Sequence, residues 1–351
     1  MPSSSHAPVV VYGAYGHTGR FVVDELLRRG LTPILSGRDE TRLEAMLDGR
    51  PDLEIRPART DEPEALAGAL AGAGAVVNVA GPFLDTALPV SQAAIAAGVH
   101  YLDVTAEQPA VEAVYAARSR DAAAAGVAVV PAMAFYGGLA DLLTTAVLAG
   151  TTEPASVTVA VGLDRWWPTA GTRVTGSRNP ARRQVVADGR LTPLADPAPT
   201  GTWHFPTAFG EQPVVAVPFS EPILLARHLP LTAVDSFLTT SALTDVRSPD
   251  TPPPSPEDAD GRSAQQFVVD VVAQVGDETR RITTTGRDIY AVSAPLVVEA
   301  AIRLLDGRAT GTGVGAPGEL FDAEDFLRAL TPGTLSLRRG PVAEDVGTRA
   351  R

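Results

Sequence analysis

The feature that most constrains the fold is an alternation of short β-branched runs with helical stretches from Val9 to about Leu148. Strands are predicted at residues 9–12, 32–36, 53–57, 75–78, 99–103 and 127–130, and helices at residues 18–29, 40–48, 62–70, 86–97 and 108–125. Strands that alternate with helices of this length indicate βαβ units and a parallel sheet covered on both faces. The first run is continuously apolar, which is typical of a central parallel strand. We therefore predict an α/β fold built on a doubly wound parallel sheet.

The pattern changes after Gly150, where strand-like runs separated by Pro and Gly replace the helical periods. These runs, at residues 156–162, 213–219, 233–240 and 266–275, predict a mixed α+β, largely antiparallel second domain. Helical character returns at residues 294–305 and 323–330. The predicted division is a first domain of residues 1–148 and 286–335, an inserted substrate and dimerisation domain of 149–285 with a flexible Pro-rich loop at 248–263, and a loose tail of 336–351.

Composition removes several classes of function. The 29 basic residues are all Arg, against 41 acidic residues, so the net charge is −12 and the chain repels nucleic acids and anionic membranes. The absence of Cys and Lys excludes disulfides, thiolate chemistry and Schiff bases. The five scattered His give no metal-ligand spacing, and no Gly-x-Ser-x-Gly motif of a serine hydrolase is present. No secretory signal is evident, and the uncharged stretches are interrupted by Pro, so no membrane association and a cytoplasmic location are predicted.

A glycine-rich turn joins the first predicted strand to the first predicted helix. Gly13, Gly16 and Gly19 have the Gly-x-x-Gly-x-x-Gly spacing that permits a tight turn, close approach of the backbone to a pyrophosphate, and packing of helix on strand. The pyrophosphate would lie on the helix N-terminus, near Tyr15, His17 and Thr18. The alternative is a purely structural turn. Strand and helix stand where the dinucleotide-binding fingerprint requires them, so we predict a Rossmann-type domain.

The end of the second predicted strand bears on the choice of cofactor. An NAD enzyme usually places an acid there, but this chain has Ser36, Gly37 and Arg38, with Arg42 one helical turn later. A hydroxyl and a guanidinium suit a ribose 2′-phosphate, which favours NADP(H) over NAD(H). The alternative is that Arg38 is a solvated residue balanced by Asp39.

Several blocks, taken in order, resemble the saccharopine dehydrogenase-like oxidoreductases. They are residues 13–19, 36–38, 78–83 (Asn-Val-Ala-Gly-Pro-Phe), 100–107 (His-Tyr-Leu-Asp-Val-Thr-Ala-Glu), 134–141 and 286–319. The resemblance implies a Rossmann domain completed by the returning chain, an inserted β domain, and NAD(P)H at the sheet edge. It also places beside the cofactor Ala80, Gly81, Pro82, Phe83 and Thr105, and it suggests a homodimer.

The chain departs from the family at informative positions. True saccharopine dehydrogenases are thought to use a Lys–His pair, and this chain has no Lys. Ala106 replaces a usual Gly, and residues 134–136 replace a Gly-Phe-Asp pattern. We therefore predict a relative with another substrate, such as an enoyl or imine reductase of secondary metabolism.

Candidate acid–base groups follow from the chemistry of hydride transfer, which requires a proton donor. Tyr136 follows the last strand of the first domain on a Gly-flanked loop, although it could instead pack at the domain junction. Asp103 and Glu107 end a strand near the cofactor, and either could instead cap a helix. Candidates for substrate binding are Arg173 as an anion clamp, Trp166 and Trp167 as pocket walls or core residues, and His204.

The leading hypothesis is an NADP(H)-dependent oxidoreductase that transfers hydride to a C=C or C=N bond of a small or carrier-bound metabolite. Two alternatives remain open: a non-catalytic sensor of NAD(P), and a redox-neutral lyase or synthase that retains NAD(P).

Overall fold

The computed structural model describes residues 6–340, and the chain forms two compact units. Within the described residues, unit 1 contains residues 6–135 and 293–322, and unit 2 contains residues 136–292 and 323–340. Within the described residues, no helix is both long and apolar enough to cross a membrane.

Unit 1 is built on a seven-stranded parallel sheet with the order β15-β6-β5-β4-β1-β2-β3. Its strands are β1 (Val9–Tyr12), β2 (Pro33–Gly37), β3 (Glu54–Pro57), β4 (Ala75–Asn78), β5 (His100–Asp103), β6 (Ala128–Val130) and β15 (Gly313–Val314). Its helices are α1 (His17–Arg28), α2 (Glu40–Glu44) with a 3-10 turn (Ala45–Leu47), α3 (Pro63–Leu70), α4 (Phe83–Ala97), α5 (Gln108–Ala125), α10 (Ser293–Leu305) and α11 (Pro317–Leu320). The predicted parallel sheet and its completion by the returning chain are confirmed.

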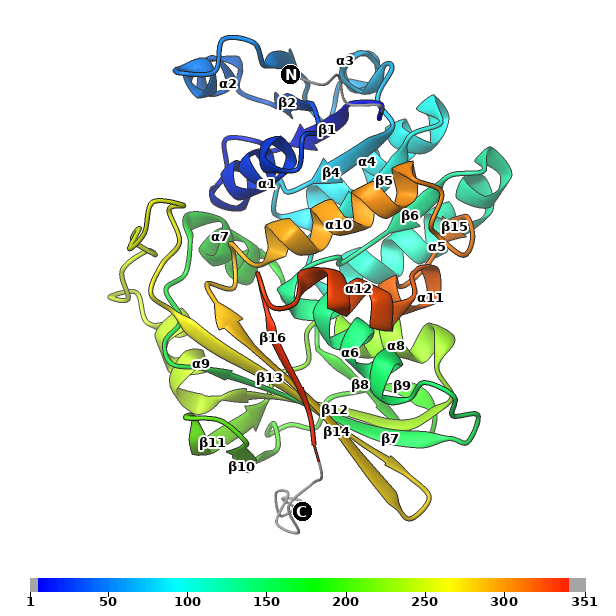
Figure 1. Ribbon diagram of the computed structural model, residues 1–351, viewed down its shortest axis with the longest axis vertical. Helices are drawn as coiled ribbons and strands as arrows, with labels where there is room; N and C mark the ends of the chain where they lie inside the picture. The colour runs from blue at the N-terminus through cyan, green and yellow to red at the C-terminus, as the bar shows by residue number, and fades with distance from the viewer. Residues whose placement is uncertain (1–5, 341–351) are drawn as a thin grey trace. The chain divides into compact units, whose positions relative to one another are not determined.

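Helices cover both faces of this sheet because its strands are apolar on both sides. Val9, Val10 and Val11 are fully buried. Helices α3, α4 and α5 cover the face that includes Val10, while α1 and α10 lie side by side on the other, with α10 crossing in front of β4 and β5 (Figure 1). The order of strands reverses beside β1, and open α/β sheets bind ligands at the carboxyl ends of the strands at such a point.

Unit 2 is built on a nine-stranded mixed sheet with the main order β10-β11-β12-β7-β13-β14-β16, to which β8 and β9 attach through β12. Only β12 and β7 pair in parallel; the other pairs are antiparallel. The strands are β7 (Ala155–Leu163), β8 (Gln184–Ala187), β9 (Arg190–Pro193), β10 (Thr200–Phe205), β11 (Gly210–Ala216), β12 (Leu231–Thr239), β13 (Gln266–Val275), β14 (Glu278–Arg287) and β16 (Ser336–Arg339). The helices are α6 (Ala140–Val147), α7 (Ala170–Arg178), α8 (Glu221–His228), α9 (Thr240–Arg247) and α12 (Ala323–Leu330).

The division between the units differs from the predicted one at all three boundaries. The chain passes between units at residues 135/136, 292/293 and 322/323, not near 148, 286 and 335. The reason is packing: α6 packs on β13 and β14, and α12 packs on α6, so both helices belong to unit 2. Residues 248–265 contain no helix or strand.

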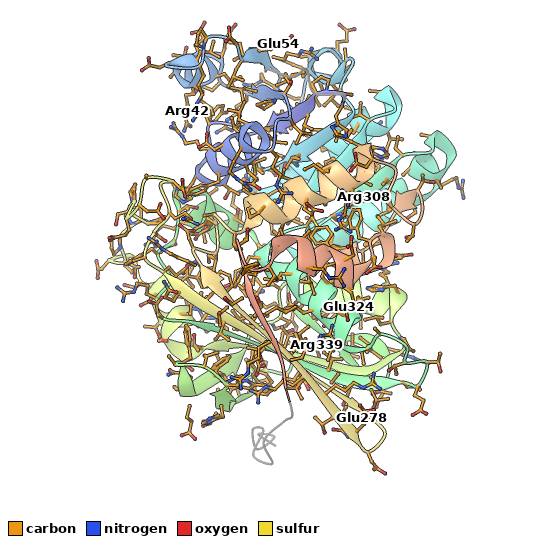
Figure 2. The ribbon with its side chains drawn as sticks, viewed as in Figure 1. Arg42, Glu54, Glu278, Arg308, Glu324 and Arg339 are labelled. Carbon is orange, nitrogen blue, oxygen red and sulfur yellow. The ribbon has the colours of Figure 1, made fainter. Side chains whose placement is uncertain are left out.

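The prediction of a loose tail from residue 336 is wrong at its start. Ser336–Arg339 form β16, which pairs antiparallel with β14, and Arg339 forms an ion pair with Glu324 of α12 (Figure 2). Main-chain pairing therefore holds a segment that carries little apolar surface. The rest of the predicted tail, from residue 341, lies outside the described residues.

Candidate functional site

The glycines of the turn after β1 are required by close contacts. Gly13 has φ +94°, and a Cβ there would lie 2.9 Å from the Cβ of Ala80. A Cβ on Gly19 would lie 2.4 Å from the carbonyl oxygen of Gly13 and 2.6 Å from that of Ala14. The first glycine therefore lets the turn approach the loop after β4, and the last lets α1 lie against the turn.

The N-terminus of α1 is suited to an anion. Its N-cap residue is Gly16, which provides no side-chain cap, and its first turn contains no acidic residue. Gly16 donates its own N–H to the carbonyl of Gly13 at 2.9 Å, which closes the turn. His17 and Thr18 form the start of the helix, where the ring of His17 meets that of Phe21 edge-on at 5.3 Å. A pyrophosphate fits this cradle because the helix dipole is not compensated by a side chain there.

The end of β2 carries the cations expected for a 2′-phosphate. Arg38 is exposed and makes no hydrogen bond or salt bridge within residues 6–340. The guanidinium of Arg42 lies 4.3 Å from the centre of the Tyr15 ring, and Arg42 is labelled in Figure 2. Gly37 leaves room for that ring, since a Cβ there would lie 2.8 Å from Tyr15 Cε1. Tyr15 and Arg42 thus form a wall beside the free Arg38.

Ser36 does not have the predicted role. It is fully buried, and its hydroxyl donates to the carbonyl of Arg56 at 2.7 Å. The hydroxyl that we expected to contact the 2′-phosphate therefore makes a hydrogen bond between β2 and β3 instead.

The sequence analysis did not include Arg59 among the candidate cofactor-binding residues. It follows β3 and pairs with Asp61 at 3.1 Å. Burial raises the pKa of Tyr12 to about 12, while the charges of Arg38 and Arg59 act in the opposite direction, so both arginines lie near the end of β1. Its place could have been predicted from the sequence, because Arg59 follows β3, and β3 ends at the same edge of the parallel sheet as β2.

A buried polar network positions the loop after β4. Asn78 accepts from the N–H of Ala80 at 3.1 Å and donates to Thr86 Oγ1 at 3.1 Å and to Tyr101 at 3.2 Å. Thr86 donates in turn to the carbonyl of Ala80 at 2.7 Å. The predicted cofactor-binding residues Ala80, Gly81 and Pro82 therefore form a braced loop, and Gly81 is exposed.

Asp103 is a structural residue rather than an acid–base group. It is fully buried and accepts from the N–H groups of Thr105 (3.0 Å) and Ala132 (2.8 Å) and from the hydroxyl of Tyr101 (2.9 Å). Burial raises its pKa to about 6, although these hydrogen bonds act in the opposite direction. Its carboxyl holds together the segments that follow β5 and β6, which corrects the predicted catalytic role and the alternative of a helix cap.

Glu107 caps a helix, but not the one that follows it. Its two carboxyl oxygens accept from the N–H groups of Phe83 (3.0 Å) and Leu84 (3.3 Å) in the first turn of α4. Its own N–H donates to Thr105 Oγ1 at 3.0 Å, and Thr105, a predicted cofactor contact, is fully buried. The N-terminus of α4 is therefore already occupied by a carboxyl group, whereas that of α1 has no such cap. Glu107 is a positioning residue, which corrects its predicted catalytic role.

Tyr136 lies in unit 2, within an aromatic column. Its ring stacks on Phe219 with centroids 4.0 Å apart and lies 5.5 Å from Trp166. Trp166 is buried, and its indole N–H donates to the hydroxyl of Tyr290 at 3.0 Å. Burial raises the pKa of Tyr136 well above its ordinary value, so its hydroxyl keeps its proton at neutral pH.

The other predicted substrate residues are placed less favourably. Arg173 donates to the carbonyls of Ser248 (3.1 Å) and Thr251 (2.6 Å), so it holds the Pro-rich loop and is not an anion clamp. His204 is exposed on β10, because its neighbours Trp203 and Phe205 face the core. This exposure removes His204 from the candidate pocket residues.

Trp167 packs against an arginine side chain. It is half-buried, and the guanidinium of Arg165 lies 5.0 Å from its ring.

Comparison with known proteins bears on the first part of the chain. Residues 9–130 match the family model of the saccharopine dehydrogenase NADP-binding domain. A probable mitochondrial saccharopine dehydrogenase-like oxidoreductase of Arabidopsis thaliana is 32% identical over 159 residues, or 40% of this chain and 35% of the relative. A saccharopine dehydrogenase-like oxidoreductase of Bos taurus is 30% identical over 152 residues, or 38% of this chain and 35% of the relative. The chain thus spans about a third of the length of these relatives, and its cytoplasmic location stays a prediction.

Comparison with solved structures extends over nearly the whole chain but shows the fold alone. The structure of saccharopine dehydrogenase (L-Glu forming) from Saccharomyces cerevisiae matches with a TM-score of 0.67 over 95% of this chain and 100% of the yeast chain, at 14% identity. The predicted resemblance is confirmed: residues 9–130 match the model of the saccharopine dehydrogenase NADP-binding domain, and the chain shares the fold of the yeast saccharopine dehydrogenase.

Proposed function

We propose that this protein is an NADP(H)-dependent oxidoreductase. The observation that carries the proposal is Arg38, which follows β2, is exposed and has no partner among residues 6–340, in the same unit as the glycine turn with its uncapped helix. When bound, NADPH would supply the hydride. The α1 N-terminus would hold the pyrophosphate, and Arg38 the 2′-phosphate, beside the wall formed by Tyr15 and Arg42.

Arg38→Ala is expected to weaken NADPH binding by about 10- to 100-fold, the value of a hydrogen-bonded charge pair, and to leave NADH binding unchanged. The measurement is a calorimetric titration of wild type and variant with each nucleotide. Arg120→Ala is the matched control, since Arg120 is an exposed arginine on α5 of the same unit. Equal losses for both nucleotides would contradict a 2′-phosphate contact, and no binding of either nucleotide by wild type would remove the proposed function.

We further propose that the hydride acceptor is a C=C or C=N bond of a small or carrier-bound metabolite. The support is chemical: the chain has no Lys for the Lys–His pair of true saccharopine dehydrogenases. Tyr136 is the proposed proton donor, because its hydroxyl stays protonated and its ring is held by Phe219. Asp103 and Glu107 are engaged in main-chain hydrogen bonds and are not candidates.

Tyr136→Phe is expected to lower turnover by about a hundredfold or more while leaving the Kd for NADPH unchanged, since loss of a general acid affects only the chemical step. The phenylalanine ring retains the stack on Phe219, so the variant removes the hydroxyl alone. The measurement is the rate of NADPH oxidation with enoyl and imine substrates. Unchanged turnover would leave an ordered water as the donor.

A further inference from the structure

Arg183, just before β8, is held in place by two contacts. Its Nη1 donates to the carbonyl of Pro218 at 2.6 Å, and its guanidinium lies 4.7 Å from the centre of the Phe219 ring. Phe219 stacks in turn on Tyr136, so the guanidinium lies at one end of the aromatic column. The side chain is half-buried, and no carboxylate lies within salt-bridge distance of it in the part of the chain that the structure describes. Arg183 is therefore a cation of fixed orientation whose remaining N–H groups can donate to a ligand.

The charges around Arg183 leave an excess of positive charge. Arg247, the last residue of α9, is exposed, makes no ion pair within residues 6–340, and is close enough to act on Arg183 electrostatically. The nearby acid is Glu221, which is buried and accepts from the N–H of Phe219 at 3.0 Å. Burial raises the pKa of Glu221, so its negative charge is itself disfavoured. Two guanidinium groups thus lie near one buried carboxyl group.

Other arginines of unit 2 with buried or half-buried side chains have firm partners. Arg281 is paired with Asp270 at 2.6 Å, and Arg173 is bound by two carbonyls. Holding a guanidinium partly away from water without a carboxylate in direct contact costs free energy, and an incoming anion would recover part of it. One nitrogen of Arg183 therefore serves as a structural tie, and its other N–H groups are left to bind a ligand.

We propose that Arg183 binds an oxyanion of the substrate, either a carboxylate or a phosphate, beside the Phe219–Tyr136–Trp166 column, and that the nearby charge of Arg247 adds to the attraction. The planar fork of a guanidinium suits both groups. The inference rests on the proposed function only in naming the ligand as substrate, and it assigns to Arg183 the clamp that the sequence suggested for Arg173. The substrate class is accordingly an acidic metabolite, or one carried on a phosphate-containing group.

The test is calorimetric titration with benzoate and with phenyl phosphate, which share a ring and differ in the oxyanion. Wild type is expected to bind at least one of them. Arg183→Ala is expected to weaken that binding about tenfold or more, and Arg247→Ala by less, because the charge-assisted hydrogen bonds come chiefly from the oriented group. Arg190→Ala, an exposed arginine on the neighbouring strand β9, is the matched control. The stronger-binding probe identifies the oxyanion.

Two results would overturn the inference: no binding of either probe by wild type, or the same affinity in Arg183→Ala as in Arg190→Ala. Arg183→Lys is a milder variant that keeps the positive charge and loses only the planar guanidinium, so it is less prone to misfold. It is also expected to bind the probe less tightly than wild type. Each variant is titrated with NADPH as well, and unchanged affinity is expected. If NADPH fails to bind to wild type while benzoate binds in an Arg183-dependent way, the proposed function falls and the anion site stands.

Discussion

Gly19→Ala is expected to abolish NADPH binding. The added Cβ would lie 2.4 Å from the carbonyl oxygen of Gly13 and 2.8 Å from the carbonyl carbon of Ala14. Real Cβ atoms do not approach the backbone so closely, so α1 must move away from the turn. The uncapped N–H groups at its N-terminus would then no longer point at the pyrophosphate position. Calorimetric titration with NADPH measures the loss.

The control for this experiment is Gly68→Ala in α3. A Cβ on Gly68 meets nothing within 4 Å, and the position is helical. Alanine there is expected to stabilise unit 1 by about 0.5–1 kcal/mol and to leave NADPH binding unchanged. All three tryptophans lie in unit 2, so their fluorescence shows whether that unit stays folded in either variant. NADPH binding by Gly19→Ala with wild-type affinity would show that the turn does not hold the cofactor.

Asp270→Ala is expected to lower the free energy of unfolding of unit 2 by about 3–5 kcal/mol, because it leaves a buried guanidinium without its partner. Asp270 is fully buried on β13 and pairs with Arg281 at 2.6 Å. It also accepts from the indole N–H of Trp203 at 2.9 Å and from Thr283 at 2.7 Å. Urea unfolding followed by tryptophan fluorescence reports this unit directly.

Two further variants test whether the loss of stability comes from stranding a buried charge or from removing any ion pair. Replacing both Asp270 and Arg281 with Leu is expected to cost much less than Asp270→Ala, since no charge is then stranded. Glu278→Ala removes an exposed carboxylate paired with Arg280 on the same hairpin (Figure 2) and is expected to leave the transition almost unchanged. Equal shifts for Asp270→Ala and Glu278→Ala would contradict the argument.

The sequence by itself determined most elements of unit 1, though not β15 or α11, and the position of the glycine turn. Their signals are local: a continuous apolar run at Val9 to Tyr12, helical periods between such runs, and glycines at fixed spacing. Strands such as β8, β9 and β14 were not predicted, because pairing with neighbouring strands, rather than an alternation of side chains, makes them strands. The boundaries between the units were also missed, since the packing of α6 and α12 decides them.

Only the tertiary structure decided what the polar side chains do. From sequence, Asp103 and Glu107 look like acid–base candidates, and Arg173 looks like an anion clamp. In the folded chain, all three hydrogen-bond main-chain groups that are 20 or more residues away. Arg183 has no motif around it, and only the folded structure shows that no carboxylate of residues 6–340 pairs with it. A polar residue type shows which bonds a side chain can make, but its partners come from distant parts of the chain, and only folding brings them within reach.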